Sequence, residues 1–522
     1  MRESIHKLAA AAVASMTASP TTTARPPRPP THVHRPYTAS ASAAAVAVAN
    51  TADISDLPVP SDFNETRSAT TSPTRSNKHL VLCFDGTGSQ FGQRPASNVL
   101  RMHQMIERGD GRVIDYYQPG IGSSIISPHK VDALLTLDSL IAYTFDEHVI
   151  AAYRFLIRNY DAGDRIWMFG YSRGAYTACV VASLIERIGL LGKGGGELVP
   201  SAWQIYKDWA TQHLAEEAAG GLSNYGAGGA STSEIADEFK DTFACATPRV
   251  FFLGLWDTVQ AVGLLRNRMC FSATRPAGIV QHVRHALSVD ERRTMFRQNL
   301  FHHPTDPAAP APPKCSACCA CCSALATADA RDVVERWFPG NHSDIGGGWP
   351  PDPDTGGSLP DLSLRWMVRH ARGLGLPFSE DQVAAFAAEG ATRAIMARTH
   401  DMLSINPRLG RGAKMAAKWW LLEILPMPYT IDAMTRDTTT AATSSTATAC
   451  AESRAEEEEE RCKIAYEPHL GRRRKIPPYA VMHWSVKWKQ MLDPRYRPRN
   501  LPVTVLYEDA EAVNMPDDLV IA

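Results

Sequence analysis

The sequence contains no run of the roughly 20 apolar residues that a membrane-spanning helix needs. It also has no surplus of charge, because 54 lysine and arginine residues face 55 aspartate and glutamate residues, for a formal net charge of −1. Its basic cluster at residues 472–475 lacks the extended basic and aromatic surface that nucleic-acid binding requires, so we expect no nucleic-acid partner. What the 522 residues do have is an apolar fraction of 44%, which is typical of a soluble globular protein with a sizeable core.

The 11 cysteines form no disulfide pattern. Cys83 and Cys179 stand alone in apolar surroundings, as free thiols do in a reducing compartment, which indicates an intracellular and most simply a cytoplasmic protein. Five other cysteines do not stand alone but form a cluster between Cys315 and Cys322. Its adjacent cysteine pairs lack the two separated Cys-X-X-Cys motifs of a structural zinc site, so we favour low-complexity sequence over a zinc site or a lipid anchor.

Composition divides the chain into one domain and several polar segments. Residues 1–77 are rich in alanine, serine, threonine and proline, cannot bury enough apolar surface to offset chain entropy, and predict a disordered arm. The basic bias at the start of this arm is compatible with a mitochondrial transit peptide and equally with a featureless tail. We predict disordered inserts at about 303–331 and 435–461, within one folded domain over 78–505, and a C-terminal tail over 506–522.

Ser172 is the candidate nucleophile, because it is the serine of a Gly-X-Ser-X-Gly motif that runs from Gly170 to Gly174. The apolar run 166–169 before it predicts a buried strand, and the pattern over 175–185 predicts a helix. A serine at a sharp turn between a strand and a helix is typical of a nucleophile elbow.

A serine hydroxyl becomes a good nucleophile only beside a base that a third group orients. Asp257 ends the apolar run 249–256, and His342 follows the strand-like run that starts at Val333, so the order Ser, Asp, His is that of α/β-hydrolases. Asp344 is a rival carboxylate. We rank it second because it lies two residues from His342 on the same segment, and we leave open that it fixes the loop or binds a metal.

The loop after the first core strand supplies candidate oxyanion donors. Backbone N–H groups at Gly86 and Thr87 can face the developing charge, with the N–H of Arg173 as the other donor. Asp85 is expected to brace this loop by hydrogen bonding. The segment also suggests a phosphatase of the Asp-X-Asp-X-Thr type, but Cys83 stands where the nucleophilic aspartate would be, so we reject that hypothesis.

Two outlying segments allow contact with lipid. Residues 414–424 have the composition of an interfacial helix, although a helix that covers the domain explains them as well and is the interpretation that we favour. The basic cluster at 472–475 suggests contact with phosphate or acidic lipid. Peripheral membrane contact therefore stays open.

Four motifs in order resemble one family, the uncharacterised α/β-hydrolase-domain family of fungi, whose bacterial relatives include type VI secretion phospholipase effectors. The resemblance covers roughly residues 78–502. The motifs are Val81-Leu-Cys-Phe-Asp-Gly-Thr-Gly88, Phe169-Gly-Tyr-Ser-Arg-Gly-Ala-Tyr-Thr-Ala178, Gly254-Leu-Trp-Asp-Thr-Val259 and Phe338-Pro-Gly-Asn-His-Ser-Asp-Ile-Gly-Gly-Gly348. Further matches include the segment from residues 471–474 through Asn500-Leu-Pro502.

The resemblance implies an α/β fold of the α/β-hydrolase type, with a mostly parallel central sheet flanked by helices. It also implies a serine hydrolase in which Ser172 attacks a carboxylic ester, His342 acts as base and then acid, and Asp257 orients it. A lipid or phospholipid acyl ester is the favoured substrate, with small esters and acylated metabolites as alternatives. No metal or organic cofactor is implied. The competing hypothesis is a non-catalytic scaffold or binding protein that keeps the fold, against which an intact triad argues.

Overall fold

In the computed structural model, the residues described are 77–87, 89, 95–109, 111–120, 135–218, 231–259, 278–301, 332–430 and 464–508. All of them belong to the second of the two units into which the chain divides, which begins at Ser76. The expected arm, apart from Asn77, lies outside these residues, as do the two expected inserts and the cysteine cluster.

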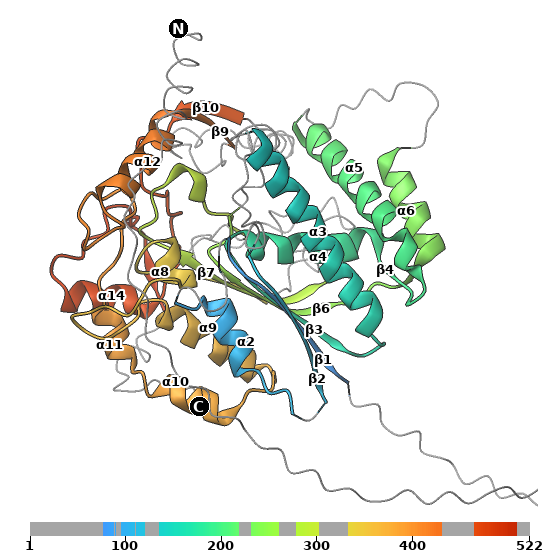
Figure 1. The fold of residues 1–522 in the computed structure, drawn as a ribbon, viewed down its shortest axis with the longest axis horizontal. Coiled ribbons are helices and arrows are strands. Elements are labelled where there is room, and N and C mark those ends of the chain that lie inside the picture. Colours follow the sequence, from blue (N-terminus) through green and yellow to red (C-terminus); the bar gives the residue numbers. More distant parts are fainter. Residues whose placement is uncertain are drawn as a thin grey trace, which may run out of the picture. The chain divides into compact units, whose positions relative to one another are not determined.

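An eight-stranded sheet forms the centre of the fold, with the strand order β12-β11-β8-β7-β6-β3-β1-β2 (Figure 1). Each of its pairings is parallel. Its strands are β1 (His79–Phe84), β2 (Val113–Gln118), β3 (Arg165–Tyr171), β6 (Val250–Trp256), β7 (Val280–Ser288), β8 (Asp332–Phe338), β11 (Val481–Met482) and β12 (Leu506–Tyr507). The central strands are apolar on both faces, as parallel strands covered by helices on both sides require.

Helices cover both faces of the sheet (Figure 1), which confirms the predicted α/β fold. One core cluster joins the sheet to α3 (Leu135–Asn159), α4 (Arg173–Ile188), α5 (Val199–Ala218) and α6 (Thr232–Phe243). A second cluster joins the other face to α2 (Asn98–Met105), α9 (Asp361–Gly373), α10 (Glu380–Ala387) and α11 (Ala391–Met396). None of the helices in the described ranges is long and apolar enough to cross a membrane.

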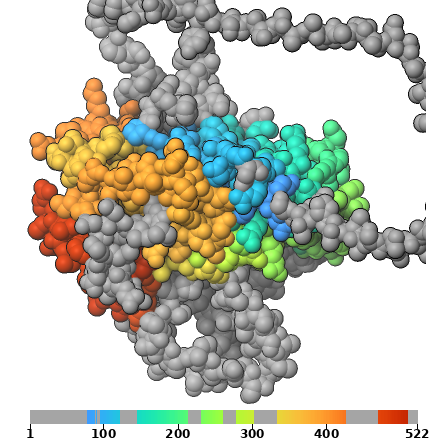
Figure 2. Space-filling view, turned by 90° about the horizontal axis from the view of Figure 1, so that it is seen from below, coloured from blue at the N-terminus to red at the C-terminus, as the bar shows by residue number. Residues whose placement is uncertain are grey.

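Shorter elements complete the description. They are β4 (Leu190–Leu191), which pairs antiparallel with β5 (Ala244–Ala246), β9 (Pro426–Thr430), which pairs antiparallel with β10 (Ile464–Pro468), the 3₁₀ turns η1 (Gly195–Leu198) and η2 (Thr294–Phe296), and the helices α8 (His342–Gly346), α12 (Ala413–Ile424) and α14 (Trp484–Leu492). In the space-filling view, the C-terminal segment in red lies beside the orange surface of the helices that precede it in the chain (Figure 2).

The folded domain extends further than the expected boundary at residue 505. Leu506 and Tyr507 form β12 and pair in parallel with Val481 and Met482 of β11. Only two residues of each strand pair, which is too short for any alternation of apolar and polar residues to show in the sequence. The edge of the sheet is therefore set by tertiary contact.

The carboxyl ends of the parallel strands meet at one edge of the sheet, where ligands and catalytic groups gather in α/β folds. Ser172 follows β3, Asp257 follows β6, and His342 follows β8 after a short turn. Since β3, β6, β7 and β8 are successive neighbours, the sheet alone brings three distant parts of the chain together.

Gly174 allows α4 to approach β1 closely. A Cβ atom at this position would lie 2.3 Å from the carbonyl oxygen of Phe84 and 2.6 Å from that of Asp85. Both atoms belong to the backbone of a buried strand and its exit loop, so they cannot move aside cheaply.

We expect Gly174→Ala to lower the free energy of unfolding by about 1–3 kcal/mol, because the added methyl group forces backbone apart. Gly373→Ala is the control, since a Cβ there meets no atom within 4 Å and lies in helix α9. It should keep the stability or raise it by up to about 1 kcal/mol. Urea unfolding followed by circular dichroism measures both, and equal midpoints for Gly174→Ala and the parent would contradict the close approach.

Candidate active site

Ser172 occupies a strained backbone conformation, with φ 59° and ψ −122°. A non-glycine residue with positive φ costs free energy and is typical of a nucleophile elbow. Ser172 precedes the first residue of α4, yet its side chain makes no capping bond to that helix. The hydroxyl is therefore left for another partner, and that partner is His342.

His342 connects the serine to a carboxylate. Its Nε2 lies 2.8 Å from the Oγ of Ser172, and its Nδ1 lies 2.6 Å from the Oδ2 of Asp257. An ionised carboxylate can only accept, so Nδ1 carries the proton and Nε2 of the neutral ring accepts from the serine hydroxyl. The structure thus brings together the three residues that the sequence analysis singled out, in the order needed to remove a proton from the serine.

Asp257 has a second charged partner that the sequence analysis missed. Nη1 of Arg474 donates to Oδ1 of Asp257 at 2.6 Å, and Nη2 donates to Oδ2 at 2.9 Å. The N–H of Ser288 also donates to Oδ1, at 2.9 Å. Asp257 has 0% of its surface exposed and Arg474 only 6%, so this is a buried bidentate ion pair.

The expected lipid or phosphate contact of the basic cluster is therefore wrong for Arg474, which turns inward to the carboxylate. Its neighbours Arg472 and Arg473 are exposed. A run of four basic residues gives no sign of which one is buried. One indication was nevertheless present in the sequence. Residues 471–474 match a motif of the resembled family, and the predicted triad left that motif without a function.

Charge at the site keeps the triad in its reactive protonation states. Burial opposes ionisation of Asp257, but Arg474 and His342 outweigh it and hold the pKa of the carboxyl below its usual range. Burial lowers the pKa of His342 and Asp257 raises it, and the net result is a pKa below the usual value of a histidine. The imidazole is therefore neutral near pH 7, as a general base must be.

The histidine ring is held by packing on two sides. The ring of Tyr171 lies 4.8 Å from that of His342, and the ring of Phe296 lies 4.7 Å away in an edge-on arrangement. The backbone N–H of His342 donates to Oε2 of Glu291 at 3.2 Å. These contacts fix the ring plane, so that the imidazole is oriented before any substrate arrives.

Asp344 does not bind His342. Its Oδ2 accepts from the backbone N–H of Asn341 and of His400, and its Oδ1 lies 2.6 Å from Nδ1 of His400. With Asn341 it forms a reciprocal capping box at the start of α8. Of the roles left open for Asp344, the geometry matches the fixing of the loop that carries His342.

A second buried ion pair lies beside the histidine. Glu291 holds Arg293 through two bonds, at 2.9 and 2.7 Å, and Arg293 keeps the pKa of Glu291 low, at about 2, against the effect of burial. The Arg293 guanidinium lies 3.7 Å from the centre of the Phe296 ring and 4.7 Å from that of Trp419. Trp419 belongs to α12, so this helix packs against the active site, in line with the covering interpretation of residues 414–424.

In the loop after β1, which carries the candidate oxyanion donors, the N–H of Gly86 is not available, contrary to the prediction. It donates to Oδ1 of Asp85 at 2.6 Å and is therefore not open to a substrate. Oδ2 of Asp85 accepts from Ser97 and from Tyr117, each at 2.7 Å, so this carboxylate braces the loop as expected. The candidate donors are thereby reduced to the N–H groups of Thr87 and Arg173.

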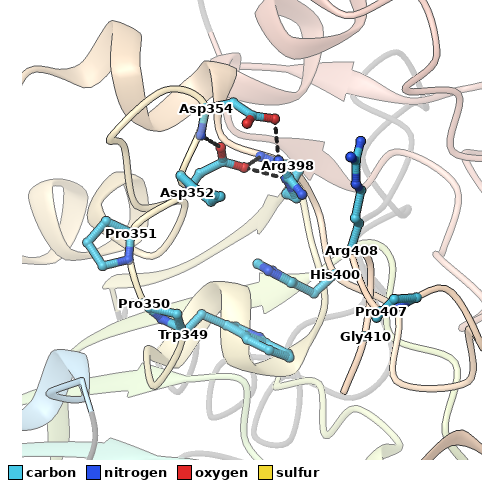
Figure 3. Close-up of a pocket in the computed structure, with 11 residues that line it drawn as sticks. Trp349, Pro350, Pro351, Asp352, Asp354, Arg398, His400, Pro407, Arg408 and Gly410 are labelled. Atoms are coloured by element: carbon cyan, nitrogen blue, oxygen red, sulfur yellow. Dashed lines mark hydrogen bonds and ion pairs between the residues drawn. The ribbon is translucent and has the colours of Figure 1, made fainter. Parts of the chain in front are cut away.

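A separate pocket of about 420 Å³ is lined by residues 349–354 and by Arg398, His400, Pro407, Arg408 and Gly410 (Figure 3). Trp349 and His400 stack at 3.9 Å with their planes 6° apart, and Arg398 bonds to Asp352 and Asp354. The bond between Asp344 and His400 links this pocket to the catalytic segment. In the part of the chain that the structure describes, no three His, Cys, Asp or Glu side chains converge as metal ligands.

Residues 78–370 match the family model described as "T6SS, Phospholipase effector Tle1-like, catalytic domain". The chain is 30% identical to "Uncharacterized protein YEL023C" of Saccharomyces cerevisiae, over 86% of this chain and 84% of the relative.

Two solved structures are similar at a low level. One is an uncharacterized protein from Pseudomonas aeruginosa, with 18% identity and a TM-score of 0.32, over 62% of this chain and 51% of that one. The other is the Tle1 effector bound to the VgrG spike of the type 6 secretion system, with 17% identity and a TM-score of 0.28, over 57% of each chain. This chain spans little more than half of the length of either.

The family model covers more than half of the chain, and the yeast relative extends over most of it, so the family resemblance in the sequence is confirmed. The chain belongs to the family of Tle1-like phospholipase effector catalytic domains, a family of lipid-ester hydrolases.

Proposed function

We propose that this protein is a serine hydrolase that cleaves the acyl ester of a phospholipid through an acyl-enzyme on Ser172. The observation that carries the proposal is the hydrogen-bonded chain from Ser172 through His342 to Asp257, with distances of 2.8 and 2.6 Å. The phospholipase description of the family supports a lipid substrate.

In the first half of the reaction, Nε2 of His342 takes the proton of the serine hydroxyl as Oγ attacks the ester carbonyl. The N–H groups of Thr87 and Arg173 donate to the oxyanion of the tetrahedral intermediate. The imidazolium then gives its proton to the leaving alkoxide, which departs as the alcohol. Ser172 is left as an acyl ester.

In the second half, water replaces the alcohol. His342 removes a proton from the water as the oxygen attacks the acyl carbon, and it then returns that proton to Oγ of Ser172. The carboxylic acid leaves and the enzyme is restored. Asp257 stays ionised throughout, holds the Nδ1 proton of the ring, and stabilises the imidazolium, while Arg474 acts through Asp257 as a positioning residue.

We expect Ser172→Ala to abolish labelling by a fluorophosphonate probe and to lower turnover by about 10⁶, because serine and base act as one unit. Ser201→Ala, an exposed serine at the start of α5, is the control and should keep both. Labelling is read by gel fluorescence and hydrolysis by release of fatty acid from short-chain phospholipids. Undiminished hydrolysis by folded Ser172→Ala would eliminate the mechanism.

The two aspartates that the sequence analysis compared as partners of His342 give different expectations. Asp257→Asn should lower turnover per folded molecule by about 10⁴, because the imidazole then favours the wrong tautomer. Asp344→Asn should lower the free energy of unfolding by about 1–3 kcal/mol, because two backbone N–H groups lose an ionised acceptor. Thermal unfolding gives the fraction of each variant that is folded. A larger loss of rate in Asp344→Asn would assign the triad to the wrong carboxylate.

Arg474→Met should move the acid limb of the kcat/KM profile to higher pH by roughly one unit. Without the guanidinium, the charge of Asp257 acts on His342 alone and raises the pKa of the ring, so the active neutral form is lost at a higher pH. Arg474→Lys keeps the charge and should keep the midpoint.

The rates are compared per folded molecule, because removing one partner of a buried ion pair costs about 3–5 kcal/mol of stability. If Arg474→Met lowers kcat/KM at every pH but leaves the midpoint of the acid limb unchanged, Arg474 has a structural role only.

A further inference from the structure

Among the described residues, three arginines lie around the triad, and two of them are neutralised by buried carboxylates. Arg474 pairs with Asp257, and Arg293 pairs with Glu291. Arg173 differs from both. Its Nε donates to the hydroxyl of Thr87, and no carboxylate of the described residues pairs with its guanidinium.

Arg173 is placed beside the reacting centre by the elbow itself. It is the first residue of α4 and follows Ser172 directly, and its bond to Thr87 holds the guanidinium against the loop that offers the other oxyanion donor. The bond uses only the Nε–H, so both terminal nitrogens keep their donors. A guanidinium in this position can donate hydrogen bonds from both terminal nitrogens next to the carbonyl that Ser172 attacks.

Within the described ranges, the surroundings of Arg173 provide no opposite charge. Burial lowers the pKa of Arg173 to about 10, and no acidic group of the described residues acts in the opposite direction. The acid nearest to Thr87 in the sequence is Asp85, which is already bonded to Gly86, Ser97 and Tyr117. Arg173 keeps part of its surface exposed, so an anion that arrives with the substrate can reach the guanidinium. Such an anion recovers the free energy that partial desolvation of an unpaired cation costs.

We propose that the Arg173 guanidinium is the subsite for the phosphate of the substrate, and that it selects esters carrying an anionic phosphodiester near the scissile bond. This inference rests on the proposed ester hydrolysis at Ser172. In a glycerophospholipid the phosphodiester and the acyl ester share one glycerol, so a group beside the oxyanion site reaches the phosphate of the same molecule. The planar guanidinium matches two phosphate oxygens at once.

The alternative role of Arg173 is to brace Thr87, and substrates with and without phosphate distinguish the two roles. Phosphatidylglycerol and diacylglycerol with identical acyl chains are compared in the same detergent micelles. Arg173→Met and Arg173→Gln should lower the ratio of kcat/KM for phosphatidylglycerol over diacylglycerol by about 10- to 100-fold, since a charge-assisted contact is lost. Arg173→Lys should keep most of the ratio.

Arg187→Met is the matched control, because Arg187 lies in the last turn of the same helix and pairs with Asp237. It should leave the ratio at the parent value. Equal losses on both lipids in Arg173→Met would assign the side chain to bracing and overturn the subsite. A parent protein that cleaves neither lipid would instead count against the proposed function.

Binding tests the subsite even in an inactive protein. Glycerophosphoglycerol, titrated into the parent protein in a calorimeter, should bind, and Arg173→Met should lose at least about tenfold in affinity. Inorganic phosphate is the second probe. Binding of inorganic phosphate without binding of glycerophosphoglycerol would overturn the headgroup assignment in favour of a free-phosphate site, and equal binding of glycerophosphoglycerol to both proteins would overturn the role of Arg173.

Discussion

The buried carboxylate of Asp257 is the group around which the site is organised. It accepts from His342 on one side and from both terminal nitrogens of Arg474 on the other. A fully buried charge is tolerated only when it is paired and hydrogen-bonded, and here the partners come from segments 85 and 217 residues away in sequence. Arg474 lies beyond residues 78–370, so the C-terminal segment completes the environment of the matched catalytic domain.

The two residues that start and end this chain of hydrogen bonds are among the four non-glycine residues with positive φ in the described part of the chain. Ser172 and Asp257 both have positive φ, at 59° and 45°, although neither is glycine. Each stands directly after a buried parallel strand, and the neighbouring strands β3 and β6 hold the two turns side by side. The sheet thus stabilises conformations that an isolated turn would avoid, and this places both side chains toward His342.

Electrostatic balance around the triad separates structural arginines from the one proposed to meet the substrate. Glu291 neutralises Arg293 and also accepts from the backbone of His342, so this ion pair holds the histidine in place. Arg293 in turn supports Phe296 and Trp419, which connects α12 to the ring that covers His342. Arg173 has no such carboxylate partner among the described residues, and this difference is the basis for proposing that it meets an anionic group.

The sequence by itself determined the α/β fold and the candidate residues at Ser172, Asp257 and His342, because strand ends, turn glycines and chain order are local features. It also indicated that Asp85 braces a loop. Only the tertiary structure decided that Arg474 faces inward, that the Gly86 N–H is occupied by Asp85, and that Asp344 binds His400. These outcomes depend on which side chains meet when segments far apart in the chain are folded together. A local sequence pattern carries no information about such contacts.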